Sequence, residues 1–274
     1  MATRLHSRQA PYAPPSPYDT MYLDHPRLAA ANVTLDPSII HHQAYVSDRL
    51  ESRQYIARHL GEVTLTDMWL GKLFRRLEAL PGRTLLVITA DHGESLGDVG
   101  YWFGHGSNIR HPCVNVPLII ACDGVVPVGG SAALVANVDL APTILDLLGV
   151  DATPLVANGL SLASTFTDPD PWPERMVPLQ AYEATRWRGV RSADYCLQSL
   201  IDPESGRRVR SFLYDLTEDP RETRDVSGRL PRVLAEHVEL EDAWFEQAGG
   251  REAGVDLRDD PEMMRRLRSL GYVQ

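Results

Sequence analysis

The longest pattern of alternating apolar and polar positions lies in residues 51–80. Charged side chains such as Arg75, Arg76 and Glu78 interrupt the apolar positions there. The apolar positions recur at intervals that return to one side of a helix every turn. They are Ile56, Leu60, Val63, Leu70, Phe74 and Leu77. This segment is therefore predicted to form a long amphipathic helix.

Two continuous apolar runs follow this helix. They read "TLLVITA" at residues 84–90 and "VPLIIAC" at residues 116–122. Neither run alternates with polar residues, which is typical of strands buried on both faces. The segment "VDLAPTILDLLG" (residues 138–149) predicts a short helix that Gly149 ends. The order helix, strand, loop, strand, helix indicates an α/β architecture.

The two ends of the chain have different patterns. Residues 1–40 are rich in Pro, Tyr and His, which favours loop over helix. After Gly159, short segments interrupted by polar residues predict a small antiparallel sheet, with a turn at "DPES" (residues 202–205). Residues 260–271 predict a terminal helix. We therefore expect a core over residues 1–165 and a small α+β subdomain over residues 166–274.

Composition narrows the function classes. The formal charge of −10 argues against binding to nucleic acid, because phosphate contacts need clustered Lys and Arg. No apolar run reaches the ~20 residues of a membrane span. No signal-like segment opens the sequence, so the location stays open and would be cytoplasmic if this start is genuine. The cysteines Cys113, Cys122 and Cys196 have no metal-site spacing and are expected to be small buried side chains.

The candidate chemistry follows the first apolar run. Asp91 and His92 come directly after it, at the end of a strand where α/β proteins bind ligands. A carboxylate beside an imidazole can bind a divalent cation. His105 follows between two glycines, which leave its ring open to a ligand. The alternative is that Asp91 caps a turn and that both histidines only pack or lie at the surface.

Other residues of this segment are expected to have no chemical role. We expect Glu94 and Asp98 to lie on a solvated loop, with Trp102 and Phe103 packed beneath it.

Several motifs in order resemble the sulfatase family of the alkaline phosphatase superfamily. The central ones are "TADHGESLGD", "FGHG" and "VPLII" (residues 89–98, 103–106 and 116–120). "APYAPPSPY", the long helix, "NVDLAPTILDLLG", "FLYDLTEDPRET" and "LRSLGY" extend the resemblance from His6 to Tyr272. The resemblance implies part of an alkaline-phosphatase-like sheet core flanked by helices.

The resemblance also implies a reaction. Sulfatases hydrolyse sulfate esters with a formylglycine or serine nucleophile beside a divalent metal, Ca²⁺ in the first place and Mg²⁺ or Mn²⁺ otherwise. By similarity, Asp91 and His92 would bind the metal, and His105 would contact the sulfate or act as a general acid. The substrate would be a small sulfate ester or a sulfated glycan.

The sequence departs from the family in two places. The motif of the nucleophile and its arginine, Cys-x-Pro-x-Arg, and two further Asp ligands are absent from these residues. Gln9 stands where relatives carry a substrate-contacting histidine, and His6 is the nearest replacement. We therefore expect half an active site, and unpaired strands that a complementing N-terminal chain would cover.

Three functions remain open at this point. The first is a sulfatase portion, truncated or completed by another chain. The second is a phosphoester or phosphonate hydrolase of the same superfamily. The third is a non-catalytic scaffold that binds no metal tightly.

Overall fold

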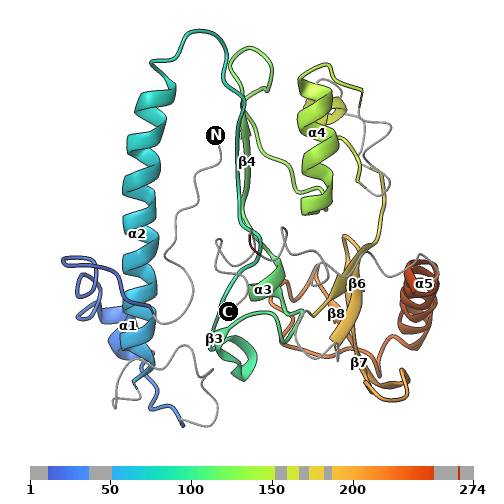
Figure 1. The fold of residues 1–274 in the computed structure, drawn as a ribbon. Coiled ribbons are helices and arrows are strands. Elements are labelled where there is room, and N and C mark those ends of the chain that lie inside the picture. Colours follow the sequence, from blue (N-terminus) through green and yellow to red (C-terminus); the bar gives the residue numbers. More distant parts are fainter. Residues whose placement is uncertain are drawn as a thin grey trace.

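The computed structural model describes residues 12–36, 51–151, 159–166, 173–181, 187–249 and 265 (Figure 1). The helices are α1 (Pro26–Ala30), α2 (Ser52–Leu77), α3 (His111–Val114), α4 (Leu140–Leu147) and α5 (Pro231–Gly249). Short 3₁₀ turns occupy Asp98–Gly100, Asn137–Asp139 and Ala163–Phe166. The strands are β1 (Leu86–Thr89), β2 (Ser95–Leu96), β3 (Trp102–Gly104), β4 (Leu118–Ala121), β5 (Val177–Gln180), β6 (Trp187–Arg191), β7 (Tyr195–Ile201) and β8 (Arg208–Asp215).

Helix α2 confirms the predicted long amphipathic helix. Its buried side includes Tyr55 and Thr66, and it also buries Glu62, which is 3% exposed. The segment that precedes α1 packs against α2, because the backbone N–H of Ala13 donates to Oε1 of Glu62 at 3.0 Å. Within residues 12–36, the segment that the sequence assigned to a loop is therefore held against α2, because a buried carboxylate of α2 binds its backbone.

Strands β1 and β4 form an antiparallel pair in which Leu86 lies opposite Ala121 and Thr89 opposite Leu118. The expectation that these strands are buried on both faces was wrong. Ile119 is 52% exposed, and β4 alternates between half-buried and exposed residues. The physical reason is that, within the described residues, the two strands hydrogen-bond only to each other.

The expected antiparallel C-terminal sheet is confirmed, with strand order β5-β6-β7-β8. The turn at residues 202–205 joins β7 to β8. One face of the sheet packs against α5 through Val190, Leu197 and Leu213 (Figure 1). The sequence pattern did not reveal α5, and the terminal helix predicted at residues 260–271 lies outside the described residues. The boundary at residue 165 stays a prediction.

Among the described helices, none combines the length and the apolar composition that a membrane span requires.

Candidate active site

The register of one small hairpin sets the geometry of the candidate site. Strands β2 and β3 pair so that Ser95 lies opposite Gly104. The residue before Ser95 is Glu94, and the residue after Gly104 is His105, so antiparallel pairing brings these two side chains together. His105 Nδ1 lies 3.4 Å from Oε2 of Glu94.

Asp91 and His92 lie beside this hairpin, directly after β1. The ring of His92 stacks on the ring of His105, with centroids 3.7 Å apart and an interplanar angle of 19°. The structure therefore brings together three of the predicted site residues, Asp91, His92 and His105. The other two, His6 and Gln9, lie outside the described residues.

Glu94 corrects the sequence-based expectation of a solvated loop. Its side chain is only 9% exposed, and its buried carboxylate lies beside the phenol of Tyr12 as well as His105. Asp98 lies at the exposed tip of the hairpin, as expected. The signal that could have identified Glu94 is its position opposite His105, which becomes visible only once the register of the hairpin is known.

An aromatic cluster supports the hairpin from below. Phe103 is 1% exposed and stacks on Tyr55 of α2 at 4.6 Å, and Trp102 packs against the same cluster. The expectation that these two hairpin residues pack beneath the loop is confirmed. Tyr12 completes the cluster, and its pKa is raised first by burial and then by the negative charge of Glu94. The phenol therefore stays protonated at neutral pH.

The loop that carries Asp91 and His92 is fixed by short backbone contacts. The N–H of Gly93 donates to the carbonyl of Cys113 in α3 at 2.8 Å. On the other side, the side-chain amide of Asn137 donates to the carbonyl of Ala90 at 3.0 Å. These bonds tie the loop to α3 and to the turn that precedes α4.

Asp91 and His92 carry a carboxylate and an imidazole, two donor types that bind divalent cations. His92 Nδ1 lies 2.8 Å from the carbonyl oxygen of Gly93, which can only accept, so Nδ1 carries the proton and Nε2 keeps its lone pair. Nε2 lies 3.8 Å from Oδ1 of Asp91, whose side chain is 63% exposed. The two candidate donor atoms therefore lie within 3.8 Å of each other. Within the described residues, no group of three or more His, Cys, Asp or Glu side chains is placed to hold a metal.

None of the three cysteines forms a disulfide, and two of them are buried. Burial, followed by the negative charge of Glu94, raises the pKa of Cys113 to about 11. Burial, followed by the charge of Glu222, raises the pKa of Cys196 to about 12. Both thiols are therefore protonated and poor nucleophiles at neutral pH. The expectation of small buried side chains holds for these two, whereas Cys122 is half-buried.

This difference predicts a selective reaction with iodoacetamide. We expect the folded chain to gain a single adduct, at Cys122, at about pH 7.5, and three adducts after unfolding in urea. Intact mass and peptide mapping would count and locate the adducts. Rapid native modification of Cys113 would contradict the burial of this thiol.

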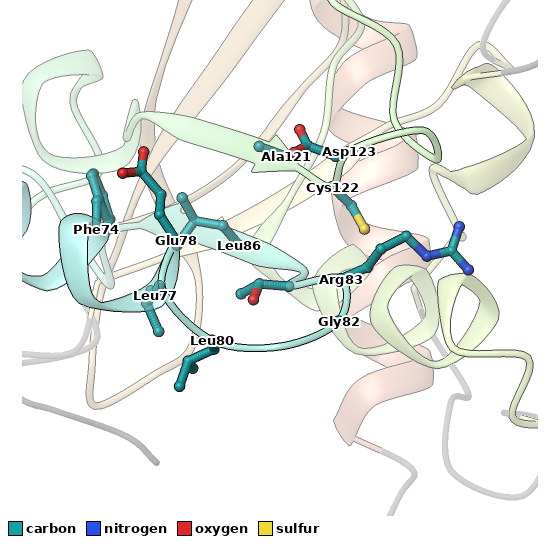
Figure 2. A pocket seen from close by; sticks show the side chains of 11 residues that line it. Phe74, Leu77, Glu78, Leu80, Gly82, Arg83, Leu86, Ala121, Cys122 and Asp123 are labelled. Atoms are coloured by element: carbon teal, nitrogen blue, oxygen red, sulfur yellow. The ribbon is translucent and has the colours of Figure 1, made fainter.

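A cavity of about 520 Å³ lies at the other end of the β1–β4 pair, away from Asp91. Figure 2 shows Leu86 and Cys122 on the strand side of this cavity, and Leu77 and Leu80 at the end of α2 and in the following loop. None of the described site residues, Asp91, His92 and His105, lines it. The site at His92 and the cavity are therefore separate features.

Comparisons with known proteins support the fold and the family of this chain. Residues 6–150 match the sulfatase family. The N-acetylglucosamine-6-O-sulfatase of Bacteroides thetaiotaomicron is 30% identical over 190 residues, which are 65% of this chain and 33% of that relative. The solved structure of BT4656 in complex with its substrate D-glucosamine-2-N,6-O-disulfate is 25% identical, with a TM-score of 0.60 over 73% of this chain and 42% of that one.

A further structure supports the fold alone. The putative sulfatase yidJ of Bacteroides fragilis is 18% identical and has a TM-score of 0.67, over 86% of this chain and 51% of that one. The fold is thus the α/β fold of sulfatases. Since the family match covers more than half of the chain, the chain belongs to the sulfatase family. It spans between a third and about half of the length of these relatives.

Proposed function

We propose that this chain contributes to the hydrolysis of sulfate esters, through a divalent-metal site at Asp91 and His92. The observation that carries the proposal is the 3.7 Å stack of His92 on His105 beside Asp91. The stack brings His105 next to His92, and Asp91 lies beside His92, so the three side chains form one small cluster. Membership of the sulfatase family supports the reaction class.

Asp91 and His92 would supply two of the ligands of the metal. Ca²⁺ is the first candidate because a carboxylate is a hard oxygen donor, and Mg²⁺ and Mn²⁺ are the alternatives. When bound, such a cation neutralises negative charge that develops on ester oxygens. The His92 proton on Nδ1 is held by the carbonyl of Gly93, which fixes the ring so that Nε2 remains a donor to the metal.

His105 would contact the sulfate group or give a proton to the leaving oxygen. It is 27% exposed, so one part of its ring is buried against the protein and another part is accessible. Its Nδ1 lies 3.4 Å from Oε2 of Glu94, which holds one edge of the ring. A stacked and partly exposed imidazole suits this role better than a freely rotating surface histidine.

Sulfated sugars are the first substrates to test. The sugar specificity in the name of the sulfatase relative and the disulfated glucosamine bound to BT4656 support this choice. The motifs of this sequence that resemble the family do not include the nucleophile or the further metal ligands that would complete the site. Turnover of matched aryl sulfate and aryl phosphate esters by a complete enzyme would separate sulfatase from phosphoester hydrolase activity.

The metal assignment predicts the effect of one substitution. We expect Asp91→Asn to lower the affinity for Ca²⁺ at least about tenfold, because an amide oxygen lacks the charge that a hard cation requires. Calorimetric titration of the full chain with Ca²⁺ would measure it. The control is Asp123→Asn, an exposed carboxylate at the far end of the strand pair. Equal affinities in both variants would contradict the site, and no binding in the unmodified chain would favour the scaffold.

A further inference from the structure

The face of the C-terminal sheet opposite α5 carries aromatic and cationic side chains that the proposed function does not use. We propose that Trp187, Phe212, Arg110 and Arg210 form a second binding surface for a sulfated sugar, outside the candidate metal site. This aromatic–arginine surface would hold a sulfate-bearing sugar unit beyond the ester that is hydrolysed. The inference rests on the proposed function, in which sulfated sugars are the first substrates.

The pairing of the strands places these side chains on one face of the sheet. Leu200 of β7 lies opposite Trp187 of β6 and opposite Arg210 of β8. Phe212 comes two positions after Arg210 in the same strand, so both side chains point to the same side. The next residue, Leu213, packs toward α5. Figure 1 shows α5 on one side of the sheet and α3 on the other, so the aromatic–arginine surface lies on the side of α3.

The ring of Phe212 is the centre of this surface. The guanidinium carbon of Arg210 lies 4.4 Å from the centroid of the ring, and that of Arg110 lies 6.0 Å from it. The indole of Trp187 lies 5.9 Å from the same ring, at an interplanar angle of 41°. Trp187 and Phe212 are half-buried, and Arg210 is exposed. Two permanent positive charges therefore lie beside rings that are partly accessible to a ligand.

Arg210 differs from the other arginines of β6 and β8 in its charge partners. Arg188, Arg191 and Arg208 each bind a carboxylate at 2.5–2.6 Å. Within the described residues, no carboxylate oxygen lies within 4.0 Å of the guanidinium of Arg210. The nearby Asp225 accepts backbone N–H groups of β8 and of its own loop. The charge of Arg210 therefore remains available to an anion.

Arg110 connects this surface to the candidate site. It lies five positions after His105, in the segment that leads from β3 to α3. Its Nη1 donates to the phenol of Tyr214 and to the carbonyl oxygen of Glu222, which holds the guanidinium against the sheet. Among the described residues, no acceptor binds its Nε or Nη2. A guanidinium that is fixed and keeps spare donors suits an oxyanion, because its planar fork can bind two oxygens at once.

The chemistry of the surface fits a sulfated sugar better than a neutral sugar or a bare anion. A sulfate monoester stays negative at all physiological pH values, and arginine stays positive. The apolar C–H face of a sugar ring can pack on aromatic rings such as those of Trp187 and Phe212. In a chain of formal charge −10, two arginines beside one ring are a local exception that complements an anionic ligand.

The experiment measures binding of 6-O-sulfated chitotetraose and of unsulfated chitotetraose to the full chain. Calorimetry gives the affinities, and ¹H–¹⁵N spectra of the indole N–H groups locate the sugar, with Trp187→Phe assigning the signal of Trp187. We expect the sulfated sugar to shift this signal and the unsulfated sugar to bind at least about tenfold more weakly. We expect Arg210→Gln to lower the affinity for the sulfated sugar about threefold or more, because one charged contact is lost.

Arg229→Gln is the matched control, because it removes an exposed positive charge from the loop before α5, which packs on the other face of the sheet. It should leave the affinity nearly unchanged. An unmoved Trp187 signal in the presence of bound sugar would overturn the proposal. Equal losses in both variants, or equal affinity for inorganic sulfate, would also overturn it, because either result would reduce the effect to nonspecific charge. The readout is binding alone, so absent turnover of sulfate esters by a complete enzyme would contradict the proposed reaction and not this surface.

Discussion

Glu222→Ala is expected to lower the free energy of unfolding by about 3–5 kcal/mol. Glu222 is 1% exposed, and its carboxylate binds the guanidinium of Arg191 at 2.5 Å and the side-chain amide of Gln198 at 2.6 Å. Truncation would leave Arg191, whose side chain is only 16% exposed, buried without its counter-charge. Urea unfolding followed by tryptophan fluorescence would measure the loss.

The control for Glu222 is an exposed ion pair in the same loop. Glu218 and Arg224 lie 3.1 Å apart, but their side chains are 66% and 55% exposed. Exposed pairs of this kind contribute about 0–1 kcal/mol, so Glu218→Ala should change stability little. If both variants lost the same stability, the effect could not be assigned to the burial of Glu222.

Glu222 also connects the C-terminal sheet to the candidate site. Its carboxylate accepts from the backbone N–H of His111 at 3.0 Å, at the start of α3. The last turn of α3 in turn accepts the N–H of Gly93 through the carbonyl of Cys113. A single buried carboxylate therefore fixes α3, and α3 in turn fixes the loop that carries Asp91 and His92. The C-terminal sheet therefore supports the candidate site through Glu222.

The parts of the fold that follow from local pattern were predictable. The spacing of apolar residues in 51–80 is a property of one segment, and α2 forms there. Gly149 at the end of the shorter helix has a φ of +69°, which agrees with its predicted role as the terminating residue. The alternating segments after Gly159 likewise contain the four strands of the C-terminal sheet.

The parts that depend on contacts between distant segments were not predictable in this way. The apolar run at 116–122 was read as fully buried, but burial depends on which neighbours cover a strand, and Ile119 is half exposed. Glu94 was read as solvated because a carboxylate in a Gly-rich loop is normally exposed. Only the pairing of Ser95 with Gly104 places it against His105.

The position of the candidate metal donors was predictable for a different reason. Asp91 and His92 are adjacent in the sequence and follow a strand directly, so one loop must carry both. The stack of His92 on His105 joins residues 13 positions apart and required the hairpin. The sequence motifs thus identified Asp91, His92 and His105 as candidate site residues, whereas the structure showed which of them are in contact.

Gly93→Ala is expected to disrupt the loop that carries Asp91 and His92. A Cβ at this position would lie 1.9 Å from the carbonyl oxygen of Pro112, and both the loop and α3 would have to move apart. The hydrogen bond from Gly93 to Cys113 would lengthen or break. Overpacking against backbone of this kind costs about 3 kcal/mol. We expect that loss in urea unfolding, together with weaker Ca²⁺ binding, because His92 Nδ1 is oriented by the Gly93 carbonyl.

Gly129→Ala separates this effect from the general cost of replacing a glycine. A Cβ at Gly129 would meet no atom within 4 Å, so its stability should stay within about 0.5 kcal/mol of the unmodified chain. Equal stability of the two variants would mean that a Cβ at position 93 fits beside the carbonyl of Pro112, so the loop and α3 would not be in the close contact described here. A Gly93→Ala chain that is destabilised but binds Ca²⁺ with unchanged affinity would show that Ca²⁺ binding does not depend on the conformation of this loop. The paired result expected here, lower stability with weaker binding, requires that the backbone contact to α3 and the donor atoms of Asp91 and His92 belong to one rigid unit.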